Sequence, residues 1–142
     1  MLIKEFATKY HVTTDTVRYY EKEGLLTPIR LESGYRFYDE TCEKAITFII
    51  VLKQLGFSLA EIRLLLDMES KPISPECNVA STTLFAHKIS ELEAKVSFFT
   101  TAIHSLQIVL SLMEQEKFAE NKPKIEGLIK DMYKDIQEKG IE

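Results

Sequence analysis

Nine apolar residues in the C-terminal half of this 142-residue chain follow one another in alternating steps of four and three positions. They are Phe85, Ile89, Leu92, Val96, Phe99, Ile103, Leu106, Leu110 and Met113. Such steps place all nine on one stripe of an α-helix, and the stripe lasts four heptads. The pattern predicts one long helix whose apolar stripe, called the seam below, packs either against a second copy of the chain in a coiled-coil homodimer or against the rest of the chain.

The first residues predict two short helices joined by a tight turn. Residues 3–9 form the first, and the second follows a turn at residues 11–12 and runs to about Lys22. Thr13 or Thr14 offers a hydroxyl N-cap, and Gly24 is a typical helix-stopping residue. Two helices and a turn within about twenty residues have the size of a helix-turn-helix.

A small β-hairpin and three further helices are predicted downstream. β-forming residues lie on both sides of the turn at 32–34, which indicates a hairpin, or wing. Helices follow at about 40–54 and 58–67, the latter with a capping box, and a last amphipathic helix follows Pro123. The chain is therefore expected to be mainly α. We divide it into four segments: 1–70, a linker at 71–76, the long helix at 77–113, and a C-terminal loop and helix at 114–142.

Charge alone does not argue for nucleic acid. The net charge is −4, and residues 1–57 contain eight Lys/Arg and eight Asp/Glu. The placement of the cations is more informative, because Arg18, Lys22, Arg30 and Arg36 fall within nineteen residues.

Localisation is inferred from what the sequence lacks. No apolar run approaches the roughly 18 residues needed to cross a bilayer, so no membrane association is expected. The first residues lack the features of a signal peptide, which favours a cytoplasmic protein. Two cysteines, Cys42 and Cys77, are too few for a disulfide scaffold.

Several motifs in the first seventy residues carry a family resemblance. They are Ile3-Lys4-Glu5-Phe6-Ala7, Thr16-Val17-Arg18-Tyr19-Tyr20-Glu21, Gly24-Leu25-Leu26, Ser33-Gly34-Tyr35-Arg36-Phe37-Tyr38 and Leu55-Gly56-Phe57-Ser58-Leu59-Ala60-Glu61-Ile62. In this order and at these distances they resemble the MerR family of bacterial transcription regulators over about residues 1–69.

The resemblance implies a fold and a mechanism. A winged helix-turn-helix domain would precede a long helix that forms an antiparallel coiled coil with its mate, and a short C-terminal helix would follow. The homodimer would bind double-stranded promoter DNA at a pseudo-palindrome, without a cofactor. In response to an effector it would bend and untwist that DNA, so that RNA polymerase engages both promoter elements.

The resemblance also assigns DNA contacts. The second helix would enter the major groove, while the adjacent tyrosines and the wing would meet phosphates. The expected DNA-binding residues are Thr14, Thr16, Arg18, Tyr19, Tyr20, Lys22, Arg36 and Tyr38.

Packing competes with DNA binding for some of these residues. Either Tyr19 or Tyr20 should lie mainly in the core, since the burial of aromatic side chains contributes much of the stability of a small domain. Strand alternation would place Arg36 and Tyr38 together on one face of the wing.

The effector is not identified by the sequence. Metal-sensing relatives, by resemblance, combine a cysteine near Cys77 with two cysteines in the loop after the long helix. Here residues 114–122 contain no Cys and no His, so no metal site is expected. Glu114, Glu116 and Glu120 are better explained as a solvated surface.

Three alternatives remain open for the signal. Cys77 lies near a helix start, where the dipole favours the thiolate, and could sense oxidants or aldehydes, or have no role. A small organic ligand could bind among Phe98, Phe99, Phe118, Met132 and Tyr133. The chain could also act without an effector, as an architectural DNA-binding factor, although the seam disfavours that class.

An enzyme is not expected. Cys77 and His87 form the only nucleophile–base pair on offer, and ten residues of helix separate them by about 15 Å. No catalytic residues are therefore assigned.

Overall fold

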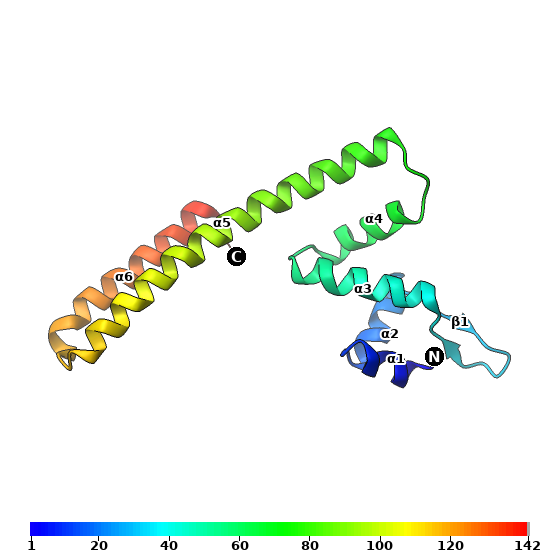
Figure 1. Ribbon diagram of the computed structural model, residues 1–142, viewed down its shortest axis with the longest axis horizontal. Helices are drawn as coiled ribbons and strands as arrows, with labels where there is room; N and C mark the ends of the chain where they lie inside the picture. Colours follow the sequence, from blue (N-terminus) through cyan, green and yellow to red (C-terminus); the bar gives the residue numbers. More distant parts are fainter. Residues whose placement is uncertain (142) are drawn as a thin grey trace. The chain divides into compact units, whose positions relative to one another are not determined.

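The computed structural model describes residues 1–141 and confirms a mainly helical chain with one small hairpin (Figure 1). It divides into two compact units, Met1–Thr82 and the part from Thr83 onward, and each is described by itself. The elements in chain order are α1 (Ile3–Lys9), α2 (Thr14–Lys22), β1 (Ile29–Arg30), β2 (Arg36–Phe37), α3 (Glu40–Gln54), α4 (Leu59–Glu69), α5 (Pro75–Glu114) and α6 (Phe118–Lys139).

Helix α2 begins and ends where its sequence signals predict. The Thr13 hydroxyl accepts the backbone N–H of Thr16 at 3.0 Å and so caps the first turn. Gly24 has a φ of 77°, a left-handed conformation that side chains disfavour. This turn lets the Leu25 N–H reach the carbonyl of Tyr20 at 2.8 Å, which closes the helix and turns the chain toward the wing.

The predicted capping box of α4 is confirmed. The Glu61 N–H donates to the Ser58 hydroxyl at 3.1 Å, and the Ser58 N–H donates to the Glu61 carboxylate at 2.8 Å. These two bonds satisfy backbone donors that a helix start leaves open.

One apolar core holds the helices of the first unit together. Its members come from α1, α2, α3 and α4 and from the segments that border the hairpin. Because α2 contributes only one side to this core, its other side faces solvent. The fully buried side chains are Phe6, Val17, Leu26, Tyr38, Cys42, Ile46, Ile49 and Ile62. Cys42 of α3 packs among these side chains, and burial raises the pKa of its thiol.

The wing is a two-stranded antiparallel hairpin in which Ile29 pairs with Phe37 and Arg30 with Arg36. The predicted turn is confirmed, and Gly34 takes a φ of 88° in it. The alternation expected beyond β2 is wrong, because the strand ends at Phe37. Tyr38 instead hydrogen-bonds through its N–H to the carbonyl of Met1 at 2.7 Å and stacks on Phe6 in the core.

The second unit is a helical hairpin in which α6 runs back along the C-terminal half of α5 (Figure 1). Ala102, Ser105 and Val109 of α5 are buried. At the far end of α6, Lys139 Nζ donates to the hydroxyl of Ser97 at 3.0 Å.

The last helix begins earlier than expected. Residues 114–122 read as a loop, but α6 starts at Phe118 and contains Pro123. Buried Asn121 explains the difference, because its Nδ2 donates to the carbonyl of Leu112 at 2.9 Å and to Gln115 Oε1 at 3.3 Å. The turn is thereby closed within three residues, and the carbonyl left without an N–H by Pro123 lies on the exposed side of the helix.

Helix α5 departs from one further expectation. Among the described helices it alone is long and apolar enough, by length and composition, to cross a membrane, with a mean hydropathy of 1.5 over 18 residues. Ser, Thr, Gln and His, not charged residues, interrupt the apolar positions of 96–113, so the helix contains no unbroken apolar run of that length. The helix carries two apolar sides, the seam and the side that faces α6.

Candidate nucleic-acid interface

The exposed side of α2 carries most of the predicted DNA-binding residues. Arg18, Tyr19 and Lys22 are exposed, and Thr14 and Thr16 are half-buried. Arg18 Nη1 donates to Asp15 Oδ1 at 3.2 Å along the same helix. Both partners are well exposed, so this pair contributes little to stability and leaves the guanidinium accessible.

The wing is tied to α2 by a second arginine. Arg36 Nε donates to Glu21 Oε1 at 2.7 Å, across fifteen residues of sequence. This hydrogen bond, and then the charge of Glu21, raise the pKa of Arg36 above its ordinary value. Arg36 is therefore held in one place beside α2 while its side chain stays partly exposed.

A hollow of about 390 Å³ brings the two arginines together. Arg18 comes from α2 and Arg36 from the wing, and Lys4 of α1 lines the same hollow beside Gly34 and Tyr35. Three cations from three elements suit a DNA phosphate, because their attraction does not depend on sequence. The sequence prediction missed Lys4; its place in the Ile3–Ala7 motif was the available signal.

Two of the predicted DNA-binding tyrosines lie in the core. Tyr20 is 3% exposed and Tyr38 is 1% exposed, whereas Tyr19 is 46% exposed. The expectation that one of the adjacent tyrosines packs inward is confirmed, and the inward one is Tyr20. The Tyr38 hydroxyl is buried without a hydrogen-bond partner among residues 1–141, and burial raises its pKa.

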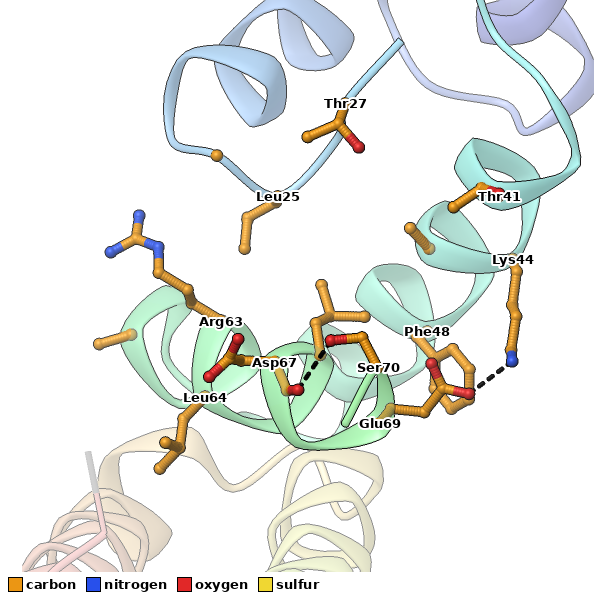
Figure 2. Close-up of a pocket in the computed structure, with 14 residues that line it drawn as sticks. Leu25, Thr27, Thr41, Lys44, Phe48, Arg63, Leu64, Asp67, Glu69 and Ser70 are labelled. Carbon is orange, nitrogen blue, oxygen red and sulfur yellow. Dashed lines mark hydrogen bonds and ion pairs between the residues drawn. The ribbon is translucent and has the colours of Figure 1, made fainter. Parts of the chain in front are cut away.

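A larger hollow of about 640 Å³ lies between α3 and α4 (Figure 2). Phe48 and Leu64 line it, and an ion pair between Lys44 Nζ and Glu69 Oε1 borders it. Its two other charged residues are also paired, Arg63 with Glu23 and Asp67 with Lys71. Its free surface is therefore mainly apolar.

The seam is exposed on the single chain. Eight of its nine residues keep between 44% and 65% of their surface exposed, and Leu92 is half-buried. Within the second unit α6 packs along a different side of α5, where Ala102, Ser105 and Val109 are buried, so α6 does not cover the seam. The two histidines of α5 lie on its surface: His87 Nε2 is 2.9 Å from Glu91 Oε1, and His104 is exposed.

The residues considered for an effector do not gather into one site within the described residues. Cys77 is half-buried in the first turn of α5, and its N–H donates to the Ser74 hydroxyl at 3.2 Å. The proposed organic-ligand pocket does not form within the described chain, because Phe99, Phe118 and Tyr133 are each more than half exposed. Residues 1–141 of the single chain bring no three His, Cys, Asp or Glu side chains together at a metal site.

Two helices joined by a turn, a hairpin beside the second helix, and cations from three elements around one hollow define a winged helix-turn-helix DNA-binding protein.

Comparison with known proteins narrows this class to a family. A family profile described as MerR HTH family regulatory protein matches residues 1–69, and one described as MerR, DNA binding, matches residues 44–107. The HTH-type transcriptional regulator ZntR of Escherichia coli (strain K12) is 37% identical over 106 residues, or 74% of each chain. The chain belongs to the MerR family of DNA-binding transcriptional regulators, which are not enzymes.

Two further similarities extend over most of the chain. The mercuric resistance operon regulatory protein of Bacillus cereus is 31% identical over 129 residues, 90% of this chain and 96% of that protein. The crystal structure of a MerR-family transcriptional regulator from Bacillus cereus aligns with a TM-score of 0.69 at 25% identity, covering 92% of this chain and 97% of that one. The similarity thus includes the long helix and the C-terminal helix.

Proposed function

We propose that the chain works as a homodimer, joined along the seam, that binds a two-fold symmetric site in promoter DNA. The exposed seam is the observation that carries this proposal. A row of apolar side chains open to water on one side of a 40-residue helix is stabilised when a second copy buries it. The antiparallel arrangement would place one DNA-binding unit at each end of the coiled coil.

On this proposal α2 enters the major groove and the wing meets the adjacent backbone. Thr14 and Thr16 would approach base edges, while Arg18, Tyr19, Lys22 and Arg36 would bind phosphates. Tyr20 and Tyr38 would act from the core, by supporting α2 and the wing. The dimer would bend and untwist the DNA between the promoter elements, which costs several kcal/mol of deformation free energy. An effector would shift the equilibrium toward the deformed DNA, on which RNA polymerase engages both promoter elements.

A competition gel shift tests whether the chain recognises a promoter. The probe is a labelled duplex from the region upstream of the chain's own gene, and the competitor is an unlabelled duplex of unrelated sequence and equal length. We expect the upstream duplex to bind about a thousandfold more tightly than the unrelated one at 150 mM salt, within the range of specific DNA recognition. Equal competition by the unrelated duplex would contradict recognition of this promoter.

We propose Cys77 as the entry point for a chemical signal, by its half-buried place in the first turn of α5. Oxidation or alkylation of the thiol would change the packing of that turn. Cys77→Ser should abolish a transcriptional response to hydrogen peroxide or methylglyoxal, measured in vitro with RNA polymerase. Cys42→Ala, which keeps the thiol at 77, is the control. A response that survives in Cys77→Ser would eliminate the thiol as sensor.

A further inference from the structure

Two acidic residues of α2 each hold one arginine of the DNA-binding surface, but they hold it differently. Asp15 contacts Arg18 three residues along the same helix, and its side chain is 93% exposed. Glu21 contacts Arg36 in the wing, and its side chain is only 25% exposed. The Glu21 bond is also shorter, 2.7 Å against 3.2 Å.

The Glu21 bond leaves most of the Arg36 guanidinium free for another ligand. A guanidinium has five N–H donors in a planar fork, and Glu21 takes the one on Nε. Among residues 1–141, no other hydrogen-bond partner of Arg36 is found. The four donors on the two terminal nitrogens therefore stay available, and their plane is set by the bond to Glu21.

Lys4 and Arg18 line the same hollow as Arg36. An anion that enters this hollow meets the cations of α1 and α2 together with the oriented fork of the wing. Because a fork binds two oxygens only when its plane is correctly turned, the residue that fixes this plane affects binding without touching the ligand.

We infer that Glu21 is a positioning residue for DNA binding, whose carboxylate turns the Arg36 guanidinium toward a backbone phosphate at the mouth of the Lys4–Arg18–Arg36 hollow. The inference rests on the proposed function, since it assumes that Arg36 meets a phosphate. For the change in DNA affinity when Glu21 is removed, this inference predicts the opposite sign from simple electrostatics. A carboxylate beside DNA repels phosphates, so removing it should strengthen binding unless the carboxylate has a positioning role.

The test compares Glu21→Ala with Asp15→Ala in the full-length chain. Both variants remove one negative charge from α2, and each deprives one arginine of its carboxylate partner, so the two variants are matched in charge. Dissociation constants are measured by fluorescence anisotropy on a duplex covering the segment that the chain protects upstream of its own gene. We expect Glu21→Ala to bind about five- to tenfold more weakly, corresponding to the loss of about one hydrogen bond of ordinary strength. Asp15→Ala should bind equally well or slightly more tightly.

Three further measurements separate positioning from a merely structural effect. Glu21→Gln keeps an acceptor for Arg36 Nε and should restore binding to within about twofold of the parent. The double variant Glu21→Ala/Arg36→Ala should bind no more weakly than Arg36→Ala alone, since both changes remove the same contact. The slope of log Kd against log salt should fall for Glu21→Ala by up to about 0.9 per subunit, as for one lost phosphate. Thermal midpoints show whether each variant is folded.

The outcomes are distinguishable. If Arg36→Ala itself binds as tightly as the parent, the phosphate contact in the proposed function fails. If Arg36→Ala is weakened but Glu21→Ala binds as well as or better than the parent, the positioning role is overturned while the proposed function stands. If Glu21→Ala is unfolded, Glu21→Gln decides between the two readings. The positioning role predicts that Glu21→Gln keeps the parental affinity, because its amide oxygen still accepts from Arg36 Nε. A salt slope of Glu21→Gln reduced as far as that of Arg36→Ala would contradict the positioning role.

Discussion

Replacing one seam isoleucine by glutamate is expected to convert the chain from a dimer to a monomer. Ile103 is 58% exposed on the single chain and lies near the middle of the seam. In a two-fold dimer the change buries two unpaired carboxylates, which costs about 3 kcal/mol or more and raises the dissociation constant more than about a hundredfold. Sedimentation equilibrium would then give a mass near 16.4 kDa in place of twice that value.

The neighbouring residue provides the control. His104 is exposed on α5 but belongs neither to the seam nor to the buried side that faces α6. His104→Glu adds the same carboxylate to the same helix and should remain dimeric. If both glutamate variants stay dimeric, the seam is not the interface; if both dissociate, charge on α5 in general, not burial in the seam, is responsible.

Loss of both arginines from the hollow should have the second largest effect. Arg18→Ala and Arg36→Ala are each expected to weaken binding to the upstream duplex about tenfold, and the double variant about a hundredfold, because each removes a charged contact to phosphate. Binding is measured at two salt concentrations, and the salt slope should fall with each substitution.

Arg63→Ala is the matched control for this second prediction. Arg63 is an exposed arginine of the same unit, but it donates to the carbonyl of Glu23 at 2.6 Å and does not line the hollow of Arg18 and Arg36. It should bind DNA as the parent does. Equal weakening by all three arginine substitutions would mean that net charge, not the placement of Arg18 and Arg36, determines affinity.

The elements that the sequence predicted best are those with local signals. Thr13, Ser58 and Gly24 act within one helical turn of their positions, so their side chains or backbone angles alone define the ends of α2 and α4. The seam was predicted equally well, because its alternating steps of four and three residues lie within a single helix.

The misplaced features depend on contacts between separate elements of the chain. Tyr38 leaves the alternation of the wing because Met1 and Phe6, more than thirty residues away, receive its backbone and ring. The early start of α6 depends on Asn121 reaching Leu112 across the turn. Lys4 joins the arginines only once α1 and the wing are packed around α2. No local pattern encodes such contacts.

Hydroxyl-radical footprinting on the region upstream of the chain's own gene tests the central proposal, a seam-linked dimer on symmetric DNA, most directly. The dimer should protect two half-sites of similar sequence, related by two-fold symmetry, over the same concentration range. Ile103→Glu should lose both half-sites together. Protection of a single isolated half-site by the parent, or of both half-sites by Ile103→Glu at parental concentrations, would contradict it.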